Sequence, residues 1–146
     1  MTNIETNGSR RRDMVPPAIR VAEEELRRVS ALANSCMELF PHVARFLARE
    51  MGRATIVADG RDLRGAVRMG SKVTYRDEGT GATREVTLVY PHEANIELNL
   101  ISILTTVGAA LIGLSAGQRI EFQTPGGTRC ITVLAVSDRV KDGSDL

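Results

Sequence analysis

The stretch LISILTTVGAALIG, at residues 100–113, changes its hydrophobic pattern in the middle. Ile101 and Ile103 flank the polar Ser102. This alternation indicates a strand, because successive side chains on a strand point to opposite faces. Residues 107–112 then form an apolar run with two alanines, long enough for about one and a half turns of helix. Because Gly113 stands where a helix C-cap favours glycine, the stretch predicts a short strand that leads into a short helix.

Alternating apolar residues lie on both sides of this stretch. Upstream, residues 73–76 and 86–90 alternate around a Glu-Gly-Thr-Gly turn. Downstream, residues 120–122 and 131–134 alternate around a Pro-Gly-Gly turn. Short turns of this composition connect neighbouring antiparallel strands. The second half of the chain is therefore predicted to be a mainly antiparallel β unit with one short helix.

The N-terminal part has a helical period instead. Apolar residues recur at helical spacing from Val21, and this segment ends at Asn34-Ser35. Pro41 suits the first turn of a second helix, which stops near Gly52. The pattern predicts an antiparallel helical hairpin with arms of about 12 residues, or about 18 Å. Together with the β unit, this hairpin makes the expected fold class α+β.

The charged residues of the hairpin are expected on its solvent side. Glu24 precedes Arg28 by four residues, a spacing that favours an ion pair on a helix surface. Glu50 is the exception, since it repeats at helical spacing with the apolar positions of the second helix. The residues expected to face solvent on that helix are Arg45, Arg49 and Arg53.

The expected organisation has four parts. Residues 1–15 form a polar tail that contains Arg10-Arg11-Arg12, and residues 16–66 hold the hairpin and a connector with a turn at Asp59-Gly60. Residues 67–136 are the β unit, and residues 137–146 form a second polar tail. Because two units of this size are each marginally stable alone, we expect the hairpin and the β unit to share an interface.

Composition narrows the classes of function. The 146 residues include 19 Lys and Arg against 18 Asp and Glu, and a net charge of +1 argues against a protein that coats nucleic acid or binds it sequence-specifically. Aromatic residues make up only 3%, too few for base-stacking platforms. The sequence contains no apolar signal-peptide core and no convincing membrane span, which indicates a cytoplasmic protein. In that compartment Cys36 and Cys130 are expected as free thiols, with a disulfide between them as the alternative.

A search for catalytic groups finds no converging set. His42 lies in the first turn of the second helix, and His92 lies at a strand end. Neither belongs to a triad pattern, and we expect both at the surface. The chain has no phosphate-binding loop, no G-x-S-x-G elbow and no cysteine or histidine pair at metal-ligand spacing. We therefore expect a protein that is not an enzyme and that binds no cofactor or metal.

Several motifs together resemble a known family. Residues 100–113 resemble the signature of the C-terminal domain of Gre-type transcript cleavage factors. The order and spacing of the flanking motifs match over residues 67–136. In so short a chain, Leu-Val-Tyr-Pro and Val-Gly-Ala-Ala-Leu-Ile-Gly-Leu are closer to the Rnk family, the regulators of nucleoside diphosphate kinase. The flanking motifs are Gly70-Ser71-Lys72-Val73-Thr74, the Gly-Thr-Gly turn, Leu88-Val89-Tyr90-Pro91 and Gln123-Thr124-Pro125-Gly126-Gly127.

The resemblance implies a fold and a partner. The fold is an FKBP-like β domain preceded by an antiparallel coiled coil. Gre-type factors dock this domain on RNA polymerase near the rim of the secondary channel and insert the coiled coil into it. Acidic residues at the coiled-coil tip then help to hold a catalytic Mg²⁺, a hard cation that prefers carboxylate oxygens.

The predicted tip departs from that pattern. It contains Cys36, Met37 and Glu38, with one acid and no Asp. The short arms also reach less far than a long Gre coil. We therefore predict a non-catalytic transcription regulator that binds core RNA polymerase near the secondary channel and competes with Gre-type factors, without transcript cleavage.

Four residues are candidate contacts with the polymerase by the same resemblance: Glu93, Ser102, Thr105 and Thr106. For Ser102 and Thr105, ordinary hydrogen bonding at a strand end is the open alternative. Thr106 replaces the proline that usually precedes the short helix in the family, which predicts a less fixed start of that helix.

Two other functions stay open. One is an interaction module for a different protein partner. The other is a peptidyl-prolyl isomerase, because the expected β fold is FKBP-like. That activity uses an aromatic-lined pocket, whereas alternation assigns most of the rings of the β unit to the core. These rings are Tyr75, Tyr90 and Phe122.

Overall fold

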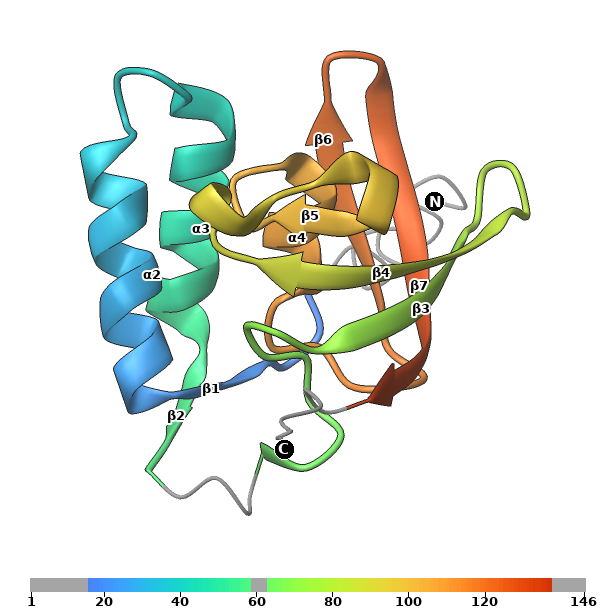
Figure 1. Cartoon of the computed structure of the whole chain (residues 1–146), viewed down its shortest axis with the longest axis horizontal. Helices are drawn as coiled ribbons and strands as arrows, with labels where there is room; N and C mark the ends of the chain where they lie inside the picture. The colour runs from blue at the N-terminus through green and yellow to red at the C-terminus, as the bar shows by residue number, and fades with distance from the viewer. Residues whose placement is uncertain (1–15, 59–62, 138–146) are drawn as a thin grey trace, which may run out of the picture.

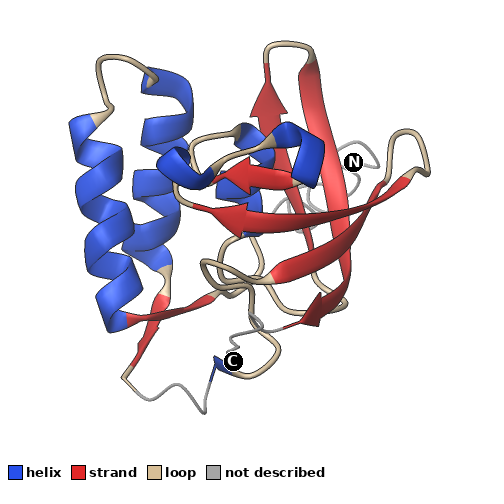
Figure 2. Ribbon diagram, viewed as in Figure 1, coloured by secondary structure: helices blue, strands red, loops and turns tan. Residues whose placement is uncertain are grey.

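A pair of helices packs beside a curled, mainly antiparallel sheet (Figures 1 and 2). The computed structural model describes residues 16–58 and 63–137. The predicted tail at 1–15 with its arginine run, the predicted turn at Asp59-Gly60, and residues 138–146 of the predicted tail at 137–146 lie outside the described residues. Within the described ranges the fold class is α+β, as the sequence predicts.

The two N-terminal helices are α2 (Glu23–Ser35) and α3 (Pro41–Arg53), which run side by side in opposite directions (Figure 1). Three glutamates in the first turn favour the start of α2, where the helix dipole attracts negative charge. Pro41 occupies the first turn of α3, where its missing N–H is not needed. The buried positions are Val29 and Ala33 of α2 and Val43, Ala44, Leu47, Glu50 and Met51 of α3.

A small parallel sheet holds the base of the helices, and the sequence analysis missed it. Strand β1 (Arg20–Ala22) pairs with β2 (Thr55–Val57), so the first helix begins at Glu23 and not at Val21. Each strand has three residues, and the partner of Arg20 is Thr55. Such a pairing leaves no local periodicity, because two short segments far apart in the chain define it.

The main sheet has five strands in the order β5-β4-β3-β7-β6. Only the β4–β5 pair is parallel, so the predicted antiparallel character is confirmed. Two sequence predictions were wrong at strand ends, since Tyr90 lies outside β4 and Ser137 belongs to β7 rather than to the tail. The strands are β3 (Lys72–Asp77), β4 (Thr83–Val89), β5 (Leu100–Ser102), β6 (Arg119–Thr124) and β7 (Gly127–Ser137).

Short helical elements fill the connections of the sheet. The 3-10 turns η2 (Pro91–Glu93) and η3 (Ile96–Leu98) lie between β4 and β5. The helix α4 (Thr106–Leu111) follows β5 and contacts α3 and β6. The strand and short helix predicted from residues 100–113 are therefore both present.

One continuous hydrophobic core joins the helices to the sheet. It contains residues from both predicted units, among them Val29, Leu47, Val73 and Leu111. The expected shared interface is confirmed by this core. Gly113 lies at a tight point of it, with φ +83°, where a Cβ atom would lie 2.8 Å from the Cβ of Ile19. Only glycine fits this approach without a shift of the backbone.

Candidate functional site

The residues proposed for partner contact fall into two segments. We call residues 36–40, between α2 and α3, the tip, and residues 90–106, from the end of β4 to the start of α4, the docking segment. Among the described residues, no hydrogen bond or ion pair joins one segment to the other. Direct polar contacts therefore do not join the two segments within the described residues.

The tip is a compact turn with an apolar surface. The amide of Phe40 donates to the carbonyl of Cys36 at 2.8 Å, and the Cys36 amide donates to the carbonyl of Leu32 at 3.1 Å. Leu39 is 75% exposed and Phe40 is 49% exposed. Glu38 is exposed and is the single acidic residue of the turn. This surface is dominated by apolar side chains and not by carboxylates.

The first half of the docking segment is a fully exposed loop. The Tyr90 amide donates to Oε1 of Glu93 at 3.3 Å, which holds this carboxylate against the start of η2. The amide of Glu97 donates to Oδ1 of Asn95 at 3.1 Å, which shapes η3. Ile96 is 87% exposed on this turn. Glu93 therefore lies at the surface beside an exposed apolar residue.

The second half of the docking segment is organised by two hydroxyl groups. Thr105 Oγ1 donates to the carbonyl of Ser102 at 2.7 Å and accepts from the amide of Gly108 at 3.0 Å. Ser102 Oγ accepts from the amide of Leu104 at 2.9 Å. These bonds correspond to the local strand-end role that was the open alternative for both residues. They also correct the expectation of a loosely fixed helix start, because Thr105 caps α4 although Thr106 replaces a proline.

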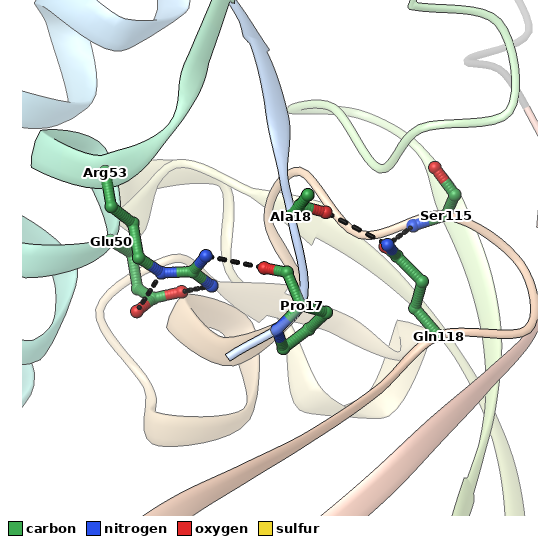
Figure 3. A network of polar contacts seen from close by, with 6 residues as sticks. All are labelled: Pro17, Ala18, Glu50, Arg53, Ser115 and Gln118. Atoms are coloured by element: carbon green, nitrogen blue, oxygen red, sulfur yellow. Dashed lines mark hydrogen bonds and ion pairs between the residues drawn. The ribbon is translucent and has the colours of Figure 1, made fainter. Parts of the chain in front are cut away.

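Hydrogen bonds of Arg53 join the C-terminal end of α3 to Pro17, as Figure 3 shows. Arg53 donates to both carboxylate oxygens of Glu50, at 3.0 and 2.7 Å, and to the carbonyl of Pro17 at 2.5 Å. Glu50 is only 5% exposed. The prediction that Arg53 faces solvent was wrong, because the guanidinium turns inward to this buried carboxylate. The signal in the sequence was Glu50 at a buried helical position, three residues before an arginine.

Gln118 makes a second link to the same N-terminal segment (Figure 3). Its Nε2 donates to the carbonyl of Ala18 at 3.0 Å, and its Oε1 accepts from the amide of Ser115 at 2.9 Å. Residues 17–20 are therefore held from both sides, by α3 and by the turn before β6. These links connect the end of α3, through residues 17 and 18, to the turn before β6.

A cation–π contact also joins α2 to the docking segment. The guanidinium of Arg28 lies 4.4 Å from the ring centroid of Tyr90, a favourable cation–π arrangement. The predicted Glu24–Arg28 pair was wrong, since Glu24 pairs with Arg27 at 3.2 Å. Burial raises the pKa of the Tyr90 hydroxyl, and the charge of Arg28 opposes that rise. Arg28 therefore packs α2 against the point where β4 ends.

Two acidic residues at the β3–β4 turn, Asp77 and Glu78, bond to the neighbouring strand β7. A hydrogen bond from Arg129 and another from the Gly79 amide hold the pKa of Asp77 below its ordinary value of 3.8. Hydrogen bonds from Thr132 and Arg76 lower the pKa of Glu78 in the same way. The bonds from Arg129 and Thr132 join the turn to β7. None of these residues belongs to the tip or to the docking segment.

The remaining titratable residues do not form a metal site within 16–58 and 63–137. His42 Nε2 lies 2.8 Å from the carbonyl oxygen of Gln123, and His92 is exposed on η2. Cys36 and Cys130 are both free thiols. In the same part of the chain, no helix combines the length and apolar character needed to cross a bilayer.

Comparison with known proteins identifies the family. The family model described as "Transcription elongation factor, GreA/GreB, C-term" matches residues 62–138, which include all five strands of the main sheet. The chain belongs to this GreA/GreB family. The solved structure of a prokaryotic transcription elongation factor GreA/GreB from Nitrosomonas europaea superimposes with a TM-score of 0.64 and 32% identity. That match covers 83% of this chain and 98% of the Nitrosomonas chain.

Two kinds of curated protein are also similar to this chain. The regulator of nucleoside diphosphate kinase from Escherichia coli strain K12 is 31% identical over 114 residues, 78% of this chain and 84% of that protein. This match confirms the resemblance to the Rnk family. The transcription elongation factor GreA of Ruegeria pomeroyi is 39% identical over 80 residues, 55% of this chain and 51% of that protein. The chain thus spans about half the length of that GreA protein.

Proposed function

We propose that this protein is a non-catalytic transcription regulator that binds RNA polymerase near the rim of the secondary channel. The observation that carries the proposal is the match of residues 62–138 to the GreA/GreB C-terminal family. The relatives named as transcription elongation factors support the same process. Binding to RNA polymerase would place this protein in the cytoplasm.

The docking segment is the proposed contact surface. Glu93 presents a carboxylate at the surface, and the hydroxyl groups of Ser102 and Thr105 hold the backbone around the start of α4. Thr106 begins that helix. In this proposal Glu93 contacts the partner directly, while Ser102 and Thr105 act by giving the surface one shape.

The two helices are the proposed short counterpart of the Gre coiled coil, on an FKBP-like β domain that spans residues 67–136. Each helix has 13 residues, which corresponds to about 20 Å of length. A tip with one carboxylate, Glu38, offers one hard ligand for Mg²⁺, whereas such an ion prefers several oxygen ligands. We therefore infer that the protein occupies the channel region and competes with Gre-type factors without supplying cleavage chemistry.

A cleavage assay tests the absence of catalysis. Stalled elongation complexes are incubated with the full chain, with its Glu38→Gln variant, or with a Gre factor as the positive control. We expect no shortened transcripts with the chain or its variant. Shortened transcripts with the chain would overturn this part of the proposal, whether or not Glu38→Gln abolishes them.

The isomerase alternative has less support from the side chains. Tyr75 is 3% exposed and Phe122 is 4% exposed, and both rings belong to the hydrophobic core. A tetrapeptide isomerisation assay checks this, and we expect a rate equal to that of the buffer.

A further inference from the structure

A groove between α3 and the edge strand β6 has no role in the proposed polymerase contact. Its volume is about 410 Å³. Cavities that hold small organic ligands measure about 300–1,000 Å³, so the groove has the size of a small-molecule site. The side chains that give it its chemistry are His42, Arg45, Phe46 and Arg49 of α3 and Glu121 and Gln123 of β6.

Two arginines of the groove lack an anionic partner. Arg45 and Arg49 lie one helical turn apart, and neither has an ion pair in the described part of the chain. By contrast, Arg27 of α2 and Arg53 of α3 pair with carboxylates. Two unpaired guanidinium groups on the wall of one groove suit a phosphoryl group, which accepts several charge-assisted hydrogen bonds.

The rest of the lining favours a ligand that is only partly anionic. Phe46 is half-buried and offers an aromatic ring, with the Arg49 guanidinium 6.0 Å from its centroid. Glu121 and Gln123 place a carboxylate and an amide in the same groove. Glu121 can accept hydrogen bonds from hydroxyl or amino groups, which a ligand made only of phosphoryl groups lacks. A ligand with an anionic end, a planar ring and hydroxyl or amino donors would satisfy all these side chains.

The groove is also held open by the fold. His42 Nε2 lies 2.8 Å from the carbonyl oxygen of Gln123 and so joins the two walls. The strand β6 is the edge of the five-stranded sheet, so no further strand of residues 16–58 and 63–137 pairs with its outer side. A preformed groove needs little rearrangement on binding, which favours affinity.

We propose that this groove binds a phosphorylated nucleoside. Arg45 and Arg49 take its phosphoryl groups, Phe46 packs against its base, and Glu121 accepts hydrogen bonds from its hydroxyl or amino groups. This site lies outside the docking segment and does not depend on polymerase binding.

Nuclear magnetic resonance titration of the full-length, nitrogen-15-labelled chain tests the proposal. ADP is added up to about 5 mM in the presence of EDTA, which removes metal-mediated binding. We expect saturable shifts confined to amides of α3 and β6. Adenosine and pyrophosphate, which each carry one half of the ligand, are expected to bind at least tenfold more weakly, because each satisfies only part of the lining.

Substitutions test whether Arg45 and Arg49 form the binding site. The double substitution Arg45→Gln with Arg49→Gln should weaken ADP binding at least tenfold, since it removes both phosphoryl contacts. Arg84→Gln is the control, because Arg84 is also exposed and has no ion pair in the described residues, yet lies on β4 away from the groove. It should leave the affinity for ADP within twofold. Thermal melts of all variants check that the fold is retained.

Four results would overturn the proposal. These are no saturable shift with ADP, equal affinity for pyrophosphate and ADP, tighter binding of a short single-stranded RNA than of ADP, or an equal loss of affinity in Arg84→Gln. Because the titration uses the chain alone, none of these results depends on whether the protein binds polymerase.

Discussion

Replacement of Arg53 by methionine should destabilise the fold strongly, because it leaves the buried carboxylate of Glu50 without its partner. The side chain of Glu50 is 7% exposed and that of Arg53 is 27% exposed, with 2.7 Å between Oε1 and Nη2. Loss of one partner from a buried ion pair costs about 3–5 kcal/mol. Solvent reaches the arginine here, so we expect a loss of about 2–3 kcal/mol in the free energy of unfolding. The Tm should fall by about 5–10 °C.

The assay is denaturant unfolding of the full chain, followed by circular dichroism. Arg49→Met is the matched control, one turn away on α3, exposed and without an ion pair in the described residues. It should change the free energy of unfolding by less than about 0.5 kcal/mol. The double substitution Glu50→Met with Arg53→Met should recover most of the loss, since an apolar pair removes the buried charge. Equal stability of Arg53→Met and Arg49→Met would refute the reasoning.

Three further predictions follow from local geometry. Thr105→Ala should destabilise the protein by about 1 kcal/mol in thermal melts through loss of the α4 cap, whereas Thr105→Ser should not. Gly108→Ala should prevent normal folding, because its Cβ would lie 2.2 Å from a backbone oxygen, while Gly52→Ala, in open space on α3, should stabilise slightly. For Asp77, the folded-state pKa is below 3.8, so its bond with Arg129 stabilises the fold above that pH, and the contribution is lost as the pH falls through the folded-state value. Asp77→Asn should therefore reduce stability more at pH 7 than near pH 2; an equal loss at both pH values would contradict the assignment.

The sequence predicted those elements whose signals are local. Helices α2 and α3 follow from the 3.6-residue period and from Pro41, and β3 and β4 follow from alternation around a glycine-rich turn. Strands β1 and β2 could not be predicted in this way, because each has three residues and the pairing of Arg20 with Thr55 is set by the tertiary fold. Sequence periodicity carries no information about such a pairing.

Polar contacts also differ in whether local sequence or the tertiary fold determines them. A helix-surface rule predicted a Glu24 partner for Arg28, but that guanidinium lies 4.4 Å from the ring centroid of Tyr90, and Glu24 pairs with Arg27. Arg53 turned inward for a related reason, since the buried Glu50 needs a cation. Local hydrogen bonding was a predicted alternative for Thr105, and its partners are indeed only three residues away on either side.

The candidate site was located by motifs, while its arrangement came from the structure. The motifs pointed to Glu93, Ser102 and the tip, but no sequence signal indicated whether polar contacts join the tip to the docking segment. The groove of Arg45 and Arg49 was also missed. Its one signal was a pair of arginines four residues apart with no acid at helical spacing to pair with them.

Binding to core RNA polymerase is the most direct test of the central proposal. The labelled full chain is mixed with core polymerase at low salt, and its anisotropy is followed as unlabelled Gre factor is added. The account predicts saturable binding that the Gre factor reverses and that Glu93→Ala weakens. Absence of binding at low salt, or binding that the Gre factor does not displace, would contradict it.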